Sequence, residues 1–139
     1  MKRVSPAQLR TFATTVLECA GVTEEHATTV SDALVLADLR GVDSHGVARL
    51  NTYARKFENG GFNSHPDISV SRLSGGLALV DADDGPGQSA GVRAMDEAMA
   101  LASDHGIGLV GVTNSNHFGT AAYYTERASA ADFIGMSMT

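Results

Sequence analysis

Apolar residues return every three or four positions through the first sixty residues, which is the spacing of amphipathic helices. Ser5 followed by Pro6 is a typical helix start, and Thr23 before two glutamates is expected to cap a second helix. The pattern therefore predicts three helices, over about 6–20, 24–40 and 45–58.

The pattern changes after Pro66, where short apolar runs alternate with segments of helical spacing. The runs 68–73 and 77–80 flank Gly75-Gly76, which is typical of a β-hairpin. Beyond the hairpin the order becomes helix, strand, helix, strand, with the strands expected over 107–113 and 133–139. Strands separated by helices favour a mixed, mainly parallel sheet with helices on its faces.

The predicted fold class is therefore α/β, with an N-terminal helical segment over 1–62 and an α/β segment over 63–139. The last run, FIGMSMT, remains strand-like up to the final residue. A core strand needs hydrogen-bonded neighbours, so we expect the chain to be incomplete: either a fragment or a unit that a second segment completes.

Charge and composition narrow the classes of function. The chain has 139 residues, and its 10 Lys and Arg against 16 Asp and Glu give a net charge of −6. An acidic chain is a poor match for nucleic acid, whose phosphates need a basic face. No apolar run reaches the length of a membrane span, and a single cysteine excludes an intrachain disulfide framework or a cysteine zinc cluster. We expect a cytoplasmic protein without nucleic-acid or membrane partners.

Two glycine-rich strings differ in what they indicate. The string GIGLVG at 106–111 matches a dinucleotide-binding fingerprint, but its glycines lie inside the expected strand instead of opening a helix. Gly85 and Gly87 are better placed, since they follow a strand and precede a helix. They could hold an anion on backbone N–H groups, but an ordinary strand-to-helix turn is the favoured interpretation. A Rossmann fold is not expected.

The first candidate site lies in the string RGVDSHGVARLNTYARKF at 40–57. His45, Arg49 and Tyr53 are spaced four residues apart, so one helix would carry all three on one face. Arginine can hold a carboxylate through two parallel hydrogen bonds, as a site for a small carboxylic acid requires. The alternative is a solvated helix face with an incidental histidine.

The second candidate site is the string VTNSNHFGTAAYY at 112–124, at the carboxyl end of an expected strand. Four polar residues in a row, Asn114 to His117, precede Gly119. Histidine can exchange a proton with a substrate near neutral pH, and glycine lets the backbone approach closely. The alternative is a polar loop that caps the next helix.

Metal chemistry has weaker support. The five histidines include no HxxxH or HExxH spacing. The acidic residues at 81–84 could hold a cation, but they are more typical of a solvated turn. We expect no metal site, and a metal-dependent hydrolase is the weakest of the alternatives.

The strings ADLRGVDSHGVARL at 37–50 and TNSNHFGTAAYY at 113–124 resemble the type 2 malate/L-lactate dehydrogenases, and DADDGPGQ at 81–88 fits more loosely. The resemblance implies an α/β fold that is not a Rossmann domain. It also implies an oxidoreductase that moves a hydride between NAD or NADP and a small 2-hydroxy or 2-oxo acid. Members of this family are homodimers or larger.

By resemblance, His117 is the proton donor and acceptor on the substrate oxygen, and Arg49 clamps the substrate carboxylate. Ser44, His45 and Tyr53 would line the same pocket. The residues expected near the cofactor are His45, Asn116, His117 and Gly119. Family chains are much longer than this one, so the alternative is a catalytically silent fragment that serves only in assembly or binding.

Overall fold

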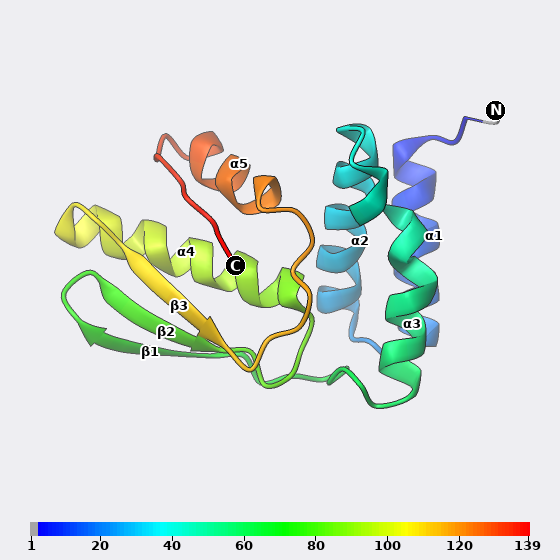
Figure 1. The fold of residues 1–139 in the computed structure, drawn as a ribbon, viewed down its shortest axis with the longest axis horizontal. Coiled ribbons are helices and arrows are strands. Elements are labelled where there is room, and N and C mark those ends of the chain that lie inside the picture. Colours follow the sequence, from blue (N-terminus) through cyan, green and yellow to red (C-terminus); the bar gives the residue numbers. More distant parts are fainter. Residues whose placement is uncertain (1–2) are drawn as a thin grey trace. The chain divides into compact units, whose positions relative to one another are not determined.

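The structure is a computed structural model that describes residues 3–139. Helices come first along the chain, and a small sheet with further helices follows (Figure 1). The structure divides into two compact units, one that ends at His65 and one that begins at Pro66. The first unit contains α1 (Pro6–Cys19), α2 (Glu24–Leu39), the single 3-10 turns η1 (Asp43–His45) and η2 (Val47–Arg49), and α3 (Leu50–Glu58). The second contains β1 (Ser69–Ser74), β2 (Leu77–Asp81), α4 (Gly87–His105), β3 (Leu109–Thr113) and α5 (Ala122–Ala130).

The first two helices start where the sequence predicts. Ser5 has extended backbone and its hydroxyl accepts the N–H of Gln8 at 3.5 Å, with Pro6 as the first helical residue. Thr23 is the N-cap residue of α2 with extended backbone, as expected, although its side chain makes no capping hydrogen bond. Glu24 and Glu25 lie in the first turn of α2, where their charges favour the helix N-terminus instead.

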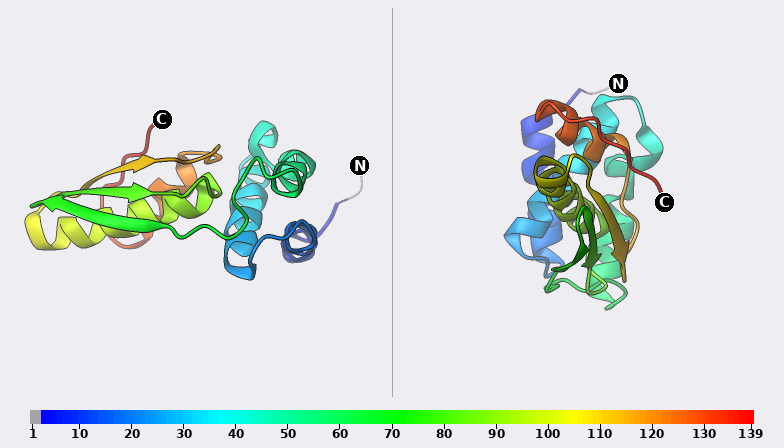
Figure 2. Two further views of the ribbon diagram at one scale, coloured as in Figure 1. Left: turned by 90° about the horizontal axis from the view of Figure 1, so that it is seen from below. Right: turned by 90° about the vertical axis from the view of Figure 1, so that its left-hand side faces the viewer.

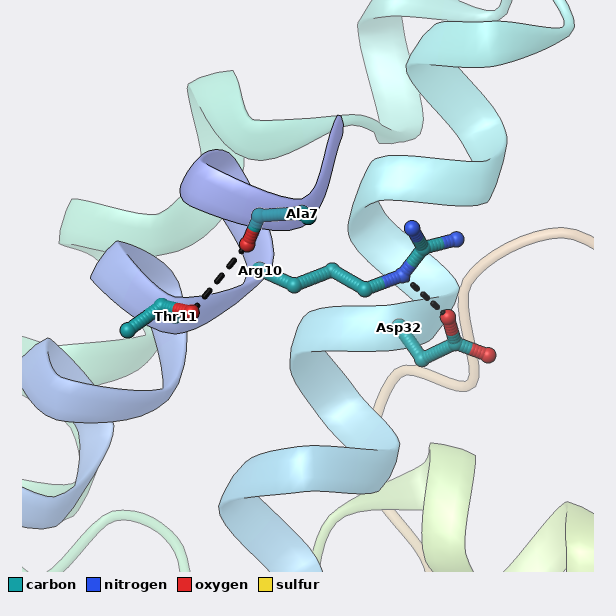
Figure 3. Close-up of polar contacts among 4 residues, drawn as sticks. All are labelled: Ala7, Arg10, Thr11 and Asp32. Atoms are coloured by element: carbon teal, nitrogen blue, oxygen red, sulfur yellow. Dashed lines mark hydrogen bonds and ion pairs between the residues drawn. The ribbon is translucent and has the colours of Figure 1, made fainter. Parts of the chain in front are cut away.

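One apolar core joins the three helices of the first unit. Its buried members are Ala13, Leu17, Ala20, Val22, Ala27, Val30, Leu34, Leu50, Tyr53, Ala54 and Phe57. Phe62 packs edge-on against Phe57, with ring centroids 5.2 Å apart. At the surface, Arg10 Nε donates to Asp32 Oδ1 at 2.6 Å and links α1 to α2 (Figure 3). Since both side chains are partly exposed, this pair contributes about 0–1 kcal/mol, and the apolar core holds the helices together.

The third helix is shorter than predicted. A continuous helix was expected over 45–58, but α3 begins at Leu50 and the two 3-10 turns precede it. Gly46 separates the turns with an extended backbone of φ −86° and ψ −160°. A helical residue needs ψ near −42°, so no helix can run through this position.

The sheet is mixed and has the strand order β1-β2-β3. β1 and β2 form the expected antiparallel hairpin, in which Val80 lies opposite Val70. β2 and β3 are parallel, with Val80 beside Val112, as expected for strands that a helix separates. The α/β class is therefore confirmed, with one antiparallel and one parallel pairing within the described residues.

Helix α4 covers one face of this sheet (Figure 2). Ala78 and Val80 of β2 are buried, while Leu77 and Leu79 alternate with them and are exposed. Helix α5 packs against α4 and buries Tyr124, whose hydroxyl donates to the carbonyl of Phe118. The second face of the sheet is thus apolar but uncovered by residues 3–139.

The strand expected over 133–139 is absent from the structure. This segment is extended, and its residues alternate between half-buried and exposed, but it pairs with no strand in the described part of the chain. Phe133 packs against the cluster around Tyr124, whereas Ile134, Met136 and Met138 are exposed. The sequence pattern produced strand-like alternation without a hydrogen-bonding neighbour, so the prediction of a strand is wrong here. None of the helices within residues 3–139 has the length and apolar character needed to cross a bilayer.

Replacing Leu34 with Ala is expected to lower the free energy of unfolding by about 2–5 kcal/mol, because it leaves a cavity in the helical core. Leu34 is 1% exposed, whereas Leu39 on the same helix is 57% exposed. The matched control Leu39→Ala should therefore change stability by no more than about 0.5 kcal/mol. Urea unfolding followed by circular dichroism measures both, and equal losses would contradict the assigned core.

Candidate functional site

The loop 43–49 brings together the polar side chains of the first candidate site. Arg49 Nε donates to the carbonyl oxygen of Ser44 at 2.6 Å. Ser44 Oγ lies 2.9 Å from His45 Nδ1, within hydrogen-bond distance. The three residues thus form a linked set at the start of α3, although not on a single helix.

The two terminal nitrogens of the Arg49 guanidinium can still bind a ligand. Only Nε has a partner, and the two terminal nitrogens make no hydrogen bond or ion pair with residues 3–139. Those terminal nitrogens form a planar fork that matches the two oxygens of a carboxylate. Anchoring through Nε fixes the direction of the fork before any ligand arrives, which lowers the entropy cost of binding.

Tyr53 does not lie on a helix face shared with His45 and Arg49. Those two residues belong to the 3-10 turns, whereas Tyr53 is inside α3 and only 3% exposed. Its ring packs within the helical core, 6.1 Å from the ring of Phe62 between centroids. The expected common face is therefore wrong, since it required a helix that Gly46 interrupts, and a contact of Tyr53 with substrate stays a prediction.

The second candidate site is built at the carboxyl ends of β2 and β3. Beyond the strands, Ala82 N–H donates to the Thr113 carbonyl at 3.0 Å, and Asp84 N–H donates to the Asn114 carbonyl at 2.9 Å. Asn116 Nδ2 donates to the carbonyls of Asp84 and Gly85, at 2.7 and 3.1 Å. These bonds fix the turn after β2 to the loop that leads to His117.

A carboxylate at the end of β2 strengthens this connection. Asp81 accepts the Asp83 N–H at 3.0 Å, and Asn114 Nδ2 donates to both of its oxygens at 3.0 and 3.1 Å. These donors, the Asp83 N–H first and Asn114 second, lower the pKa of Asp81. Asp83, Asp84 and Asn114 all have positive φ, so three residues on the two connected loops hold a left-handed backbone.

His117 is exposed, and its ring contacts the backbone of its own loop. Its Nδ1 accepts the N–H of Gly119 at 3.3 Å. Gly119 has φ +80°, a conformation that glycine adopts at little cost. With Nδ1 accepting, the neutral ring carries its proton on Nε2.

The glycine-rich turn before α4 is an ordinary strand-to-helix turn. A side chain at Gly87 would overlap the backbone of Asn116 and His117, so this loop covers the N-terminus of α4. The amide nitrogen of Asn116, expected near the cofactor, is already used by two carbonyls, which leaves only its Oδ1 for another donor.

Each unit of the structure thus carries one half of the expected site. Ser44, His45 and Arg49 are together in the first unit, and Asn116, His117 and Gly119 are together in the second. No group of three or more potential metal-binding side chains occurs among residues 3–139. Sequence reasoning considered Asp81 only as a cation ligand and did not find its role in supporting the loop of Asn114. It missed Asp38, which lies within residues 37–50 and accepts the Val47 N–H at 2.9 Å.

Replacing Asn114 with Gly should raise the pKa of Asp81 towards its ordinary value, because one of its two hydrogen-bond donors is lost. A depressed carboxyl pKa stabilises the folded state above the unfolded pKa, and this stability is lost as the pH falls through the folded pKa. The variant should therefore lose less stability than the wild type on acidification.

Carbon-13 NMR titration of the Asp81 carboxyl group measures this shift. Asn59→Gly, an exposed asparagine in the other unit, is the matched control and should leave the titration of Asp81 unchanged. An unchanged Asp81 titration in Asn114→Gly would contradict the assigned hydrogen bonds.

Comparison with known proteins agrees with the site strings. The family model for malate/L-lactate dehydrogenase matches residues 4–139. A malate dehydrogenase from Pyrococcus horikoshii is 49% identical over 137 residues, which cover 99% of this chain and 38% of that protein. An L-sulfolactate dehydrogenase from Methanocaldococcus jannaschii is 42% identical over 124 residues, covering 89% of this chain and 36% of that protein.

Solved structures show the same relationship. The structure of malate dehydrogenase from Pyrococcus horikoshii superposes with a TM-score of 0.89 at 48% identity, covering 94% of this chain and 37% of that chain. The sulfolactate dehydrogenase from Methanocaldococcus jannaschii gives a TM-score of 0.88 at 39% identity, covering 93% and 38% of the two chains. The chain thus spans less than two fifths of the length of these relatives. The expected resemblance is confirmed: the chain belongs to the malate/L-lactate dehydrogenase family.

Proposed function

We propose that this chain carries the carboxylate-binding arginine and the acid–base histidine of a dehydrogenase. The reaction would move a hydride between NAD or NADP and a small 2-hydroxy or 2-oxo acid. The observation that carries the proposal is the anchored guanidinium of Arg49, whose terminal nitrogens have no partner within residues 3–139. An oriented, unpaired fork of this kind suits a small carboxylic acid better than a neutral ligand.

Names of the relatives support the substrate class. They include malate, L-sulfolactate and ureidoglycolate dehydrogenases, the last printed with NAD(+). Each of these substrates has a hydroxyl group on the carbon next to a carboxylate. We propose that Arg49 binds the carboxylate that these substrates share, with Ser44 and His45 beside it in the same loop. The proposal specifies no contact for the rest of the substrate.

His117 would carry the proton. During reduction of a 2-oxo acid, Nε2 of the protonated ring donates to the carbonyl oxygen, and in the reverse direction Nε2 accepts the hydroxyl proton. Full protonation places a hydrogen on Nδ1 as well, so the contact with the Gly119 N–H must then open. The bound nicotinamide supplies or accepts the hydride.

Support for the cofactor site is narrower than for the carboxylate site. The expected cofactor contacts are His45, Asn116, His117 and Gly119, and among them the Asn116 amide nitrogen is engaged by the carbonyls of Asp84 and Gly85. We propose that NAD or NADP binds to the whole protein through these residues together with other surfaces. Homodimerisation and a cytoplasmic location belong to the same proposal.

A second candidate function is assembly without catalysis. Its support is the uncovered apolar face of the sheet, where Leu77, Leu79 and Leu109 are 43%, 39% and 65% exposed. Large exposed apolar patches mark interaction surfaces. A chain with this role alone would self-associate and bind no nicotinamide cofactor.

Fluorescence titration of this chain with NADH and then NADPH discriminates between the two functions. Under the dehydrogenase proposal, the cofactor binds and a panel of 2-oxo acids oxidises it, and His117→Ala abolishes this turnover because the proton donor is gone. The control His105→Ala, at the end of α4, should retain turnover. Absence of cofactor binding together with self-association would favour the assembly role for this chain.

Arg49→Lys should weaken the binding of L-malate and pyruvate by about tenfold or more, because lysine cannot make two parallel hydrogen bonds to one carboxylate. The matched control is Arg55→Lys, an exposed arginine on α3, which should leave the affinity unchanged. Calorimetric titration measures both variants. Equal affinities for the wild type and Arg49→Lys would overturn the assignment of Arg49.

A further inference from the structure

The loop that carries Ser44, His45 and Arg49 has little support of its own. Its two 3-10 turns contain short-range hydrogen bonds, from the His45 N–H to the Val42 carbonyl at 2.9 Å and from the Arg49 N–H to the Gly46 carbonyl at 3.0 Å. Single turns of this kind are only marginally stable without outside contacts. The extended Gly46 also leaves the Val47 N–H, at the start of η2, without a helical acceptor.

Asp38 supplies that acceptor from another helix. It lies in the last turn of α2, is half-buried, and accepts the Val47 N–H on Oδ2 at 2.9 Å. η2 leads directly into α3, so this carboxylate caps the N-terminus of that helical run from outside it. A negative charge is favoured there by the helix dipole and by the unpaired N–H groups.

Gly46 makes room for this contact. A Cβ at position 46 would overlap the Asp38 carboxyl group, whose atoms are the three nearest neighbours of that position. The φ of Gly46 is −86°, a value that any residue can adopt, so steric exclusion by Asp38 is the reason for glycine here. Asp38 and Gly46 therefore act together, because the carboxylate on α2 packs directly against the loop backbone at the glycine.

We propose that Asp38 is a positioning residue that sets the affinity of Arg49 for the carboxylate of the substrate. Asp38 fixes the backbone at Val47, two residues before Arg49, and Arg49 Nε is in turn held by the Ser44 carbonyl. The fork of Arg49 is thus oriented by contacts at both ends of the loop. Asp38 also occupies the N-terminus of the η2–α3 run, which leaves Arg49 as the group that receives the substrate anion.

This inference rests on the proposed role of Arg49, so the test has two independent readouts. The first is the exchange rate of the Val47 backbone amide, measured by NMR on this chain without ligand. The second is the affinity for L-malate and for pyruvate, followed on the Nε–Hε signal of Arg49. Asp32→Asn is the matched control, because it removes a carboxylate of the same helix that pairs with Arg10 (Figure 3).

Asp38→Ala should make the Val47 amide exchange about tenfold faster and weaken the binding of both acids by about tenfold, as expected for the loss of one charge-assisted hydrogen bond. Asp38→Asn should stay within about threefold of the wild type in both readouts, because the amide oxygen can still accept the Val47 N–H. Asp32→Asn should match the wild type. Unchanged exchange and affinity in Asp38→Ala, or an Asp38→Asn as defective as Asp38→Ala, would overturn the proposal.

A double-mutant cycle tests the pairing with Gly46. Gly46→Ala alone should be as harmful as Asp38→Ala, whereas adding Gly46→Ala to Asp38→Ala should cost nothing further, since the clashing carboxylate is gone. Additive losses would contradict the pairing. If neither acid perturbs Arg49 in the wild-type chain, the proposed carboxylate site itself fails, and the amide exchange separately shows whether Asp38 holds the loop.

Discussion

The parallel pairing of β2 with β3 is the interaction on which the second unit depends. The pairing continues beyond the strands, through the Ala82 and Asp84 N–H groups to the carbonyls of Thr113 and Asn114. Parallel strands end at the same edge of a sheet, so the turn after β2 and the loop after β3 must emerge side by side. This geometry lets Asn116 brace the loop of His117 with a single side chain.

In the first unit, the helices and their polar contacts hold the irregular loop 43–49 in one conformation. The helices pack through a continuous apolar core, which fixes the ends of α2 and α3. Val47 of the loop between them packs against that core, and polar contacts such as the one from Asp38 hold the loop backbone. The chemistry-bearing side chains therefore lie on irregular backbone next to rigid elements, as is usual for functional loops.

Local patterns predicted most elements because the periodicity of apolar residues reports directly on which face each element buries. The hairpin, the parallel strand β3 and the helices α1, α2, α4 and α5 follow from this pattern. The helix expected over 45–58 failed at Gly46, where the backbone is extended and lies against the carboxyl group of Asp38, eight residues earlier in the chain. The strand expected over 133–139 failed because alternation alone supplies no hydrogen-bonding partner.

The sequence by itself determined the class of fold, the family strings and the identity of the candidate residues, because residue type and spacing carry that information. It did not determine which atoms of those residues stay available. The tertiary structure placed Tyr53 in the core, engaged the amide nitrogen of Asn116 and left the terminal nitrogens of Arg49 without a partner among residues 3–139. Such outcomes depend on contacts between residues distant in the chain, and no local pattern encodes them.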